Sequence, residues 1–424
     1  MKSVFKSEKY RITKQRLKLS LFTFFKWVVC SCFAGVVIGF IGTIFHILLE
    51  YVTEFRQTHW WMLFLLPIAG ILITAIYHAA HSAKSRGTNL VITAIQSNEE
   101  VPGKMAPLIM ISTLLTHACG GSAGREGAAL QIGGSIGSEL AKFFDFDEKD
   151  TRILIMCGMS ACFGALFGTP IAAAVFSMEV ISVGIMYYAA LVPCTISALI
   201  GSGISSIFGI SGTHFDIGII PDFSLGNAAK IIPLSAFFAL ASILLCITLH
   251  KAHALYSKYL ENQYIRAVVA GIFVIILRFL CGSSDYLGAG TDIIAKSFVT
   301  QSIWCAFLLK IIFTAVTLGG GFKGGEIVPT LFVGATLGSF LGPVFGLPIG
   351  LCAACGMVTV FCGVTNCPLT SLILSIEMFG GDSIKFCMLC IAIGYLLSGY
   401  YSLYNSQKII YSKYKTEYVN KKTH

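Results

Sequence analysis

An arginine and a glutamate stand side by side within a run of glycines, in the stretch GGSAGREGAALQIGGSIG at residues 120–137. The surrounding chain is mostly apolar, and an ionised side chain in apolar surroundings is costly unless it has a partner or a function. Two interpretations stay open. Glu126 forms an ion pair with Arg125 that fixes the turn, or its charged carboxylate occupies an anion site and leaves that site on protonation. In the second case protons and anions compete for one place.

A second glycine-rich loop, GGGFKGGEIVP, covers residues 319–329. Both loops lead into a stretch that we expect to be helical. Backbone N–H groups at the start of a helix and the positive end of its dipole point at the same spot, which is the usual arrangement of an anion site. Four glycines are therefore candidates for anion-binding loops: Gly124, Gly127, Gly324 and Gly325.

The chain carries an internal repeat. CGMSACFGALFGTPIAAAVFSMEV from Cys157 matches CGMVTVFCGVTNCPLTSLILSIEM from Cys355 at an offset of 198, and IGGSIGSEL from Ile132 matches VGATLGSFL from Val333 at an offset of 201. Transporters built from duplications commonly bind substrate near the membrane midplane, where half-helices of the two repeats converge. The matched stretches also contain G-x-x-x-G spacings that allow close helix packing: Gly133 with Gly137, and Gly334 with Gly338.

The 424 residues are 55% hydrophobic and only 12% charged, which indicates an all-α polytopic membrane protein. Long apolar runs lie near residues 28–49, 61–80, 152–167, 170–192, 231–249, 265–281, 303–319, 350–364 and 384–401. Shorter pieces lie near 106–118, 127–141, 329–346 and 367–379. Several are shorter than the roughly 20 helical residues that cross a bilayer. We therefore expect broken and re-entrant helices, which are tolerated where they line a cavity or are buried in protein.

Basic residues crowd both ends of the chain, at Lys2, Lys6, Lys9, Arg11, Lys14, Arg16 and Lys18, and at Lys408, Lys413, Lys415, Lys421 and Lys422. The positive-inside rule places both termini in the cytoplasm. The net charge of +9 also raises the question of nucleic acid, but these residues form no stripe, so no nucleic-acid partner is expected. The first apolar run is long and lacks a small-residue cleavage site, so we interpret it as a retained span.

The duplication and the terminal charges divide the chain into four segments. Residues 1–26 are a cytoplasmic basic segment, residues 27–215 the first transmembrane repeat, residues 216–405 the second, and residues 406–424 a short cytoplasmic tail. We expect no soluble regulatory domain after the last span.

Fifteen cysteines include two C-x-x-C pairs, Cys352 with Cys355 and Cys387 with Cys390. Each pair lies in an apolar run, so small hydrophobic packing residues are the preferred interpretation, with no metal and no cofactor. The spans contain no H-E-x-x-H and no G-x-S-x-G, so an enzyme is not expected. Five histidines are scattered and interpreted as structural: His46, His59, His78, His81 and His117.

G-R-E-G followed by Q-I-G-G-x-I-G resembles the gating-glutamate motif of the CLC family of chloride channels and anion/proton antiporters. The likeness extends over nearly the whole chain. It implies the CLC-type fold, in which each subunit of a dimer contains two inverted-topology repeats of tilted, broken and re-entrant helices. By this resemblance Glu126 is the gate between the anion path and the extracellular solution, with Arg125 as a coupling or tuning residue.

The sequence departs from the chloride-type motif in the first loop. Where that motif reads G-S-G-I-P, this chain reads RGTNLVITAI, so the serine and the proline are absent. Thr88 keeps a hydroxyl donor and Asn89 adds amide N–H donors for an anion. The alternative is that Asn89 caps the following helix.

The third family motif falls on Gly325 to Pro329, where Glu326 precedes Ile327 and Val328. G-F-K-G-G-E-x-x-P resembles the fluoride-exporting branch of the family. This resemblance implies that backbone N–H groups near Ile327 and Val328 bind the anion and that Glu326 tunes or relays. Fluoride is strongly hydrated, so it needs dense donors or the positive edge of a ring such as that of Phe332, whose alternative is an ordinary core position. Lys323 pairs with Glu326 or snorkels to the interface.

Near the C-terminus, YYSLYNSQ ends the last apolar run. The resemblance implies that a tyrosine here points its hydroxyl at the anion. Tyr404 matches best, Tyr401 is second, and a tyrosine of the membrane-surface belt is the alternative for both. In FSMEVI, Glu179 matches the first acidic position of the family, whereas the internal proton-relay position falls on Val180. Protons must then move another way, with Glu126 swinging inward and Glu326 or the Thr and Asn donors assisting.

These features predict a fluoride/proton antiporter that exports fluoride and gives fluoride resistance. The alternative is a chloride channel or chloride/proton exchanger of the same family. We expect a homodimer in the lipid bilayer of a bacterial inner (plasma) membrane, with fluoride or chloride and protons as the transported ions.

Overall fold

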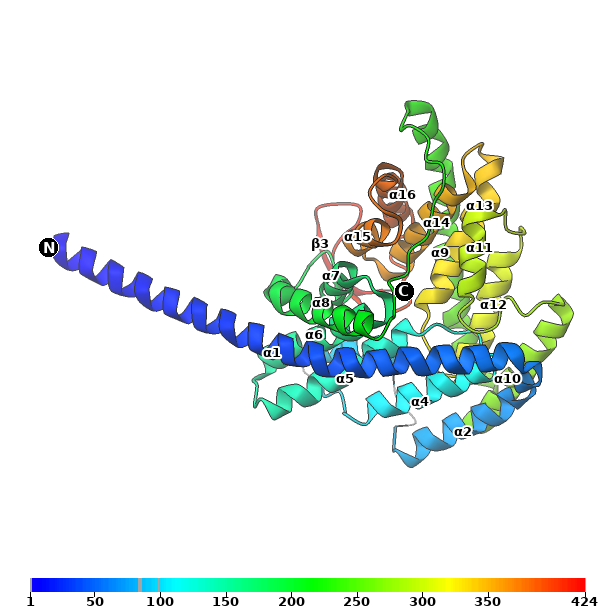
Figure 1. Cartoon of the computed structure of the whole chain (residues 1–424), viewed down its shortest axis with the longest axis horizontal. Coiled ribbons are helices and arrows are strands. Elements are labelled where there is room, and N and C mark those ends of the chain that lie inside the picture. Colours follow the sequence, from blue (N-terminus) through cyan, green and yellow to red (C-terminus); the bar gives the residue numbers. More distant parts are fainter. Residues whose placement is uncertain (1, 83–85, 98, 424) are drawn as a thin grey trace.

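The computed structural model describes residues 2–82, 86–97 and 99–423. Met1, the first residue of the predicted segment 1–26, and His424, the last residue of the predicted segment 406–424, lie outside the described residues. Most of the described chain is helical (Figure 1). The helices of the first half are α1 (Lys2–Thr58), α2 (Leu66–Ala79), α3 (Thr88–Ser97), α4 (Met105–Ala118), α5 (Glu126–Phe143), α6 (Glu148–Phe167), α7 (Pro170–Glu179) and α8 (Leu191–Ile207). Those of the second half are α9 (Leu225–Tyr259), α10 (Gln263–Cys281), α11 (Thr291–Val299), α12 (Ala306–Gly319), α13 (Ile327–Val344), α14 (Ile349–Thr365), α15 (Pro368–Phe379) and α16 (Ile384–Leu397).

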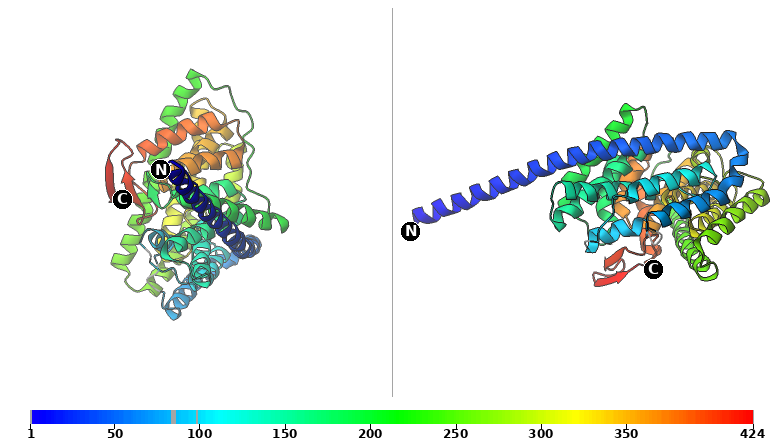
Figure 2. Two further views of the ribbon diagram at one scale, coloured as in Figure 1. Left: turned by 90° about the vertical axis from the view of Figure 1, so that its left-hand side faces the viewer. Right: turned by 90° about the horizontal axis from the view of Figure 1, so that it is seen from below.

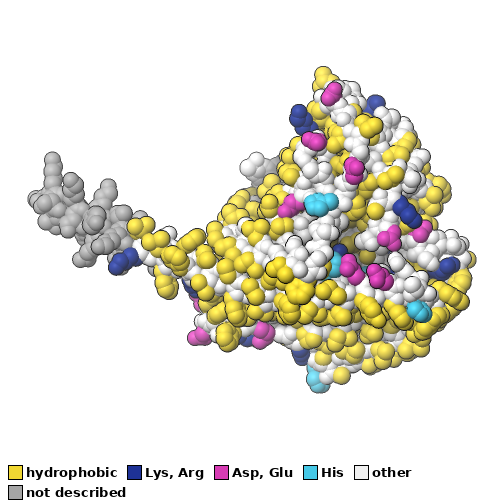
Figure 3. Space-filling model, viewed as in Figure 1, with side chains coloured by type: hydrophobic (Ala, Val, Ile, Leu, Met, Phe, Trp, Pro, Cys, Tyr) yellow, Lys and Arg dark blue, Asp and Glu magenta, His cyan; other side chains and the backbone are white. Residues whose placement is uncertain are grey.

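The protein is a multi-pass membrane protein. Within the described ranges, seven helices are long and apolar enough to cross a membrane, and six further apolar helices are shorter. Hydrophobic side chains cover much of the face in Figure 3, as lipid contact requires. The predicted run 170–192 is not one span, because α7 ends at Glu179 and a short strand and a 3-10 turn precede α8.

The two halves repeat the same series of helices, which confirms the duplication. Helices α5 and α13 are both 18 residues long and both follow a glycine-rich loop. Helices α7 and α15 both begin with a proline, which suits the first helical position because its missing N–H has no partner there anyway. Gly133 of α5 touches the backbone of Gly158 in α6, and Gly334 of α13 touches that of Gly356 in α14. The G-x-x-x-G glycines therefore serve close helix packing in both repeats.

Two carboxylates join the repeats away from the glycine-rich loops. Glu179, at the end of α7, accepts the backbone N–H groups of Leu369 (3.1 Å) and Thr370 (2.8 Å) at the start of α15. Glu377, near the end of α15, accepts those of Ile171 (2.9 Å) and Ala172 (2.8 Å) at the start of α7. Each helix thus carries the cap of the other, and a carboxylate is favoured at a helix N-terminus.

The C-terminal segment folds back onto the first half. Strand β2 (Lys408–Tyr411) pairs in parallel with β1 (Ser182–Val183) and antiparallel with β3 (Tyr418–Lys422), in the order β1-β2-β3. These strands lie at one edge of the helical body (Figure 2). Residues 406–423 of the predicted tail are therefore an ordered part of the fold, in which Ile409 is buried.

One C-x-x-C pair lies on α14 and the other on α16, and the two pairs face each other. The Sγ atoms of Cys355 and Cys387 lie 4.0 Å apart, and Cys387 also contacts the hydroxyl of Ser383 at 3.7 Å. No group of three or more Cys, His, Asp or Glu residues in the described ranges has the arrangement of a metal site. All four thiols are buried among apolar side chains, in agreement with the packing interpretation.

Candidate functional site

The glycine-rich loops of the two repeats meet at Gly124 and Gly325. Each donates its backbone N–H to the carbonyl of the other, at 2.7 Å in both directions. A side chain is excluded here, because a Cβ on Gly124 would lie 2.6 Å from the carboxylate of Glu126 and 3.1 Å from the backbone nitrogen of Val328. The pairing therefore brings the starts of α5 and α13 together around Glu126.

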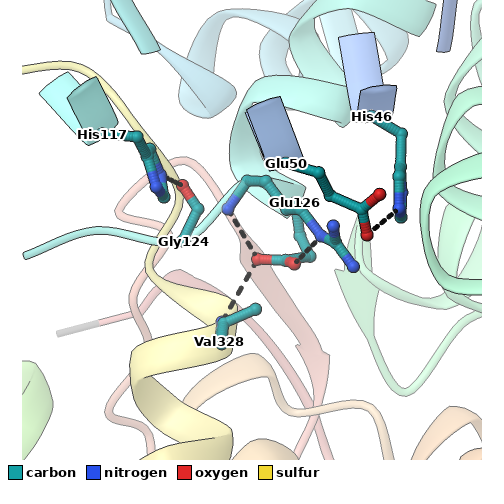
Figure 4. A network of polar contacts seen from close by, with 7 residues as sticks. His46, Glu50, His117, Gly124, Glu126 and Val328 are labelled. Atoms are coloured by element: carbon teal, nitrogen blue, oxygen red, sulfur yellow. Dashed lines mark hydrogen bonds and ion pairs between the residues drawn. The ribbon is translucent and has the colours of Figure 1, made fainter. Parts of the chain in front are cut away.

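The carboxylate of Glu126 lies at the N-terminus of α13 (Figure 4). Its Oε2 accepts the backbone N–H groups of Val328 (3.3 Å) and Arg125 (3.0 Å), and its Oε1 is 3.6 Å from the guanidinium Nε of Arg125. The side chain is fully buried. The contact with Arg125 is thus present, and the carboxylate also accepts the N–H group of Val328 at the start of α13.

Gly127, in the first turn of α5, is closely surrounded by groups from two other segments. A Cβ on Gly127 would lie 3.0 Å from the Cα of Gly325, 3.2 Å from the carboxylate of Glu326 and 3.4 Å from the hydroxyl of Thr88. Three segments that are far apart in the sequence therefore converge on one glycine. Gly324 is close as well, since a Cβ there would lie 3.1 Å from the carbonyl of Gly124.

A cavity of about 770 Å³ opens beside these groups, on the side of the molecule that holds residues 86–89 and 403–406. Its lining includes three of the predicted anion residues, Thr88, Asn89 and Tyr404, together with the coupling residue Glu326 and the loop glycine Gly324. It also includes the basic side chains of Arg86, Arg266 and Lys323, and the imidazoles of His250 and His253. Glu326 is the one carboxylate among the described lining residues. The cavity is therefore positively charged and attracts anions.

Asn89 lies in the first turn of α3, which begins at Thr88, so it is not the N-cap residue of that helix. Its Oδ1 accepts the backbone N–H of Ser406 at 2.9 Å, which fixes the amide so that its Nδ2 is the atom left for another partner. Tyr404 belongs to the same cavity, whereas Tyr401 is absent from the described lining.

Phe332 occupies the core position given as its alternative, and Lys323 does not form the predicted ion pair with Glu326 in the described structure. The ring of Phe332 is fully buried and packs under the ammonium of Lys310 at 5.1 Å, outside the described cavity lining. Lys323 lines the cavity and places its ammonium 4.7 Å from the ring centre of Tyr77, with no ion pair to Glu326 within 4.0 Å among the described residues. Ile327 is buried at the start of α13.

Gln131 was not singled out from the sequence, although it stands in the same motif as Glu126. Its Nε2 donates to the carbonyl of Gly127 (3.0 Å) and to the hydroxyl of Thr88 (3.4 Å), so it ties α3 to the first turn of α5. The available signal was its spacing of four residues from Gly127, which places both on one side of a helix. His117 contacts the carbonyl of Gly124 at 3.2 Å, which agrees with a structural role.

The fold and the site together define a membrane transport protein built from two inverted repeats, with a carboxylate over the helix start where the repeats meet. The sequence matches the voltage-gated chloride channel family over residues 69–399, and the chain belongs to this CLC family. It is 33% identical to a chloride/fluoride channel protein of Pseudomonas syringae pv. tomato, over 92% of this chain and 88% of that protein. It is 23% identical to the H(+)/Cl(−) exchange transporter ClcA of Vibrio cholerae, over 84% of this chain and 82% of that protein.

Solved structures give the same result. The crystal structure of a CLC-type fluoride/proton antiporter aligns with a TM-score of 0.87 and 32% identity, over 91% of this chain and 98% of that one. A slow cyanobacterial Cl−/H+ antiporter aligns with a TM-score of 0.74 and 18% identity, which shows the shared fold alone.

Proposed function

We propose that this protein exports fluoride from the cytoplasm in exchange for protons. The observation that carries the proposal is the carboxylate of Glu126, which accepts the N–H of Val328 where a transported anion would bind. A group that can be either a charged carboxylate or a neutral acid lets protons and anions exclude each other from one place, which is the basis of exchange. The fluoride-linked relatives support the choice of anion.

The cavity is the proposed entrance for cytoplasmic fluoride. Arg86, Arg266 and Lys323 attract the ion, and Thr88, Asn89 and Tyr404 offer it hydroxyl and amide donors in place of water. When Glu126 is protonated and withdraws, the N–H of Val328 becomes available and the anion moves to it. Return of the ionised carboxylate expels the anion toward the outside.

Glu326 favours fluoride over chloride in this scheme. An ionised carboxylate beside an anion path repels every halide, whereas a protonated one donates a hydrogen bond. Fluoride accepts strong hydrogen bonds and gains more from such a donor than chloride does. Chloride transport remains the second candidate, because the backbone N–H groups at the start of α13 suit either halide.

The remaining assignments follow from this function. We place the protein in the inner (plasma) membrane of a bacterium with both termini in the cytoplasm, in keeping with the basic residues at the two ends. We propose a homodimer on the CLC resemblance, and transport without enzymatic turnover. The mass of the purified protein in detergent, after subtraction of the detergent, tests the dimer.

The test uses the purified full chain in liposomes loaded with potassium fluoride or potassium chloride. Valinomycin starts efflux, an ion-selective electrode follows the halide, and a pH electrode follows protons. We expect fluoride efflux well above chloride efflux, coupled to proton uptake, and at least a tenfold loss of proton uptake in Glu126→Gln. Glu261→Gln, which neutralises an exposed carboxylate between α9 and α10, is the matched control.

Equal efflux of the two halides would favour the chloride alternative. Absence of any flux in the wild-type protein would sink the proposal.

A further inference from the structure

The inward route of the proton needs a titratable group on the cavity side. Val180, at the relay position of related exchangers, is a fully buried valine and carries no proton. The carboxylate of Glu179 next to it is held by the backbone of Leu369 and Thr370 at the start of α15. Neither residue lines the cavity described above.

Two histidines of α9 lie on the wall of that cavity. His253 is exposed, and His250, three residues earlier and so on the same side of the helix, is half-buried. The imidazole of His250 lines this cavity together with Leu403 and Tyr404. His250 therefore lies between the exposed part of the cavity and the residues around the anion path.

The Nε2 atom of the His250 ring is buried and has no hydrogen-bond partner among the described residues. In the neutral tautomer that carries its hydrogen on Nδ1, Nε2 holds a lone pair and can accept a proton. Buried polar atoms normally have a protein or water partner. An orphaned ring nitrogen on a cavity wall therefore indicates a site that water or a proton fills.

Three further residues that line the cavity have a buried polar atom without a hydrogen-bond partner in the described chain: Gln131 Oε1, Glu326 Oε2 and Tyr404 Oη. They come from α5, the loop before α13 and the C-terminal segment. A hydrated network in the inner cavity would satisfy all four at once. It would also connect His250 with Glu326, which is next to the helix start that holds Glu126.

The charges around His250 affect when it takes a proton. The titratable and charged groups that share its cavity are His253 on its own helix, Arg266 of α10, Arg86 before α3, Lys323 and Glu326 before α13, Tyr77 of α2, and Tyr404. The three basic side chains disfavour an imidazolium when they are charged. An anion that enters the cavity offsets this positive charge. Protonation of His250 is therefore favoured when an anion is present.

We propose that His250 is the proton acceptor on the cytoplasmic side, an inference that rests on the proposed exchange of fluoride for protons. The proton leaves the carboxyl of Glu126, passes through water or Glu326, and binds the lone pair of Nε2. The imidazolium then returns a proton to water beside His253, and the neutral ring is restored. One proton enters and one leaves, so no other reactant is needed.

The experiment compares the wild-type protein with His250→Asn and His250→Gln in liposomes. The pH is set equal on both sides and varied from 5.5 to 8, and fluoride efflux and proton uptake are recorded together. Both variants are expected to exchange at least tenfold more slowly at neutral pH and to show a flatter dependence on pH. Fluoride binding by titration calorimetry at low pH is expected to stay within threefold of the wild type. His253→Asn is the matched change on the same side of α9, and it is expected to keep the slope of the wild-type profile.

Wild-type rates with an unchanged pH profile in His250→Asn would overturn the inference. So would a loss of fluoride binding together with transport, because that places His250 in the anion path or in the packing. An equal flattening in His253→Asn would assign the effect to the charge of the whole cavity and would also overturn it. A wild-type protein without coupled fluoride and proton flux rejects the proposed function itself, which separates the two failures.

Discussion

Gly124 and Gly325, 201 positions apart in the sequence, exchange two backbone hydrogen bonds of 2.7 Å. This contact fixes the start of α5 against the start of α13. Glu126, two residues after the first glycine, then has its carboxylate within hydrogen-bond distance of Val328, three residues after the second. The position of the Glu126 carboxylate is therefore set by the interface between the two repeats.

A methyl group at position 124 is expected to disturb this geometry. In Gly124→Ala the new Cβ would lie 2.6 Å from the carboxylate of Glu126, and forced overpacking of this kind costs about 1–3 kcal/mol. We expect at least a tenfold loss of exchange in liposomes with retained helix content. Gly203→Ala is the matched control, since Gly203 lies in α8 with open space around it and alanine there should stabilise by about 0.5–1 kcal/mol. Normal exchange in Gly124→Ala would contradict the role given to the contact.

Removal of the Tyr404 hydroxyl separates binding from stability. Its Oη has no hydrogen-bond partner among the described residues, so Tyr404→Phe should leave the thermal midpoint in detergent within a few degrees of the wild type. A hydrogen bond to a charged ligand contributes about 1.5–3 kcal/mol, so fluoride binding should weaken roughly ten- to hundredfold. Titration calorimetry measures the affinity. Tyr401→Phe, outside the described cavity lining, supplies the comparison, and equal losses in both variants would argue against Tyr404 as a ligand.

The reciprocal caps predict a crossed pattern of local opening. Glu179→Gln should speed amide hydrogen exchange at Leu369 and Thr370 in α15, and Glu377→Gln should speed it at Ile171 and Ala172 in α7. Loss of a helix cap costs about 0.5–2 kcal/mol, so each rate should rise roughly two- to thirtyfold.

Hydrogen exchange with mass spectrometry of peptides from each helix measures this pattern, with Glu261→Gln as the control. Faster exchange confined to the helix that carries the substitution would show that the caps do not cross between repeats.

The C-terminal sheet should respond to alkaline pH. Burial lowers the pKa of Lys413 from its ordinary value of 10.5 to about 8, although its ammonium donates to the carbonyl of Tyr395 at 3.2 Å and the hydroxyl of Ser398 at 3.3 Å. Between these two pH values the unfolded chain binds more protons than the folded one, so the contribution of Lys413 to stability rises with pH across that window. Below about pH 8 both states are protonated and the contribution is constant.

Thermal unfolding in detergent at pH 7.5 to 10, for the wild type and Lys413→Met, measures this contribution as a difference in slope. Other groups titrate equally in both proteins. Parallel curves would mean that Lys413 keeps its ordinary pKa in the folded protein.

Much of the architecture was accessible from the sequence because it depends on local pattern. Apolar runs and their ends placed most helices, since a backbone in lipid must satisfy its own hydrogen bonds. The spacing from Gly158 to Pro170 and Glu179, repeated at Gly356, Pro368 and Glu377, identified the duplication. The prediction of one apolar span over 170–192 was wrong, because hydrophobicity alone does not show where a buried segment stops being helical. Helix α7 ends at Glu179 and α8 begins at Leu191.

The sequence by itself determined a duplicated membrane protein with a glutamate at the start of one half-helix and a second anion-type loop 201 residues later. Only the tertiary structure decided which groups share a space. It made Glu179 and Glu377 crossed caps, packed the ring of Phe332 against Lys310, and brought His250, Glu326 and Tyr404 to one cavity. The physical reason is that periodicity along one chain sets which side of a helix a residue occupies, whereas its partners depend on how separate helices pack together.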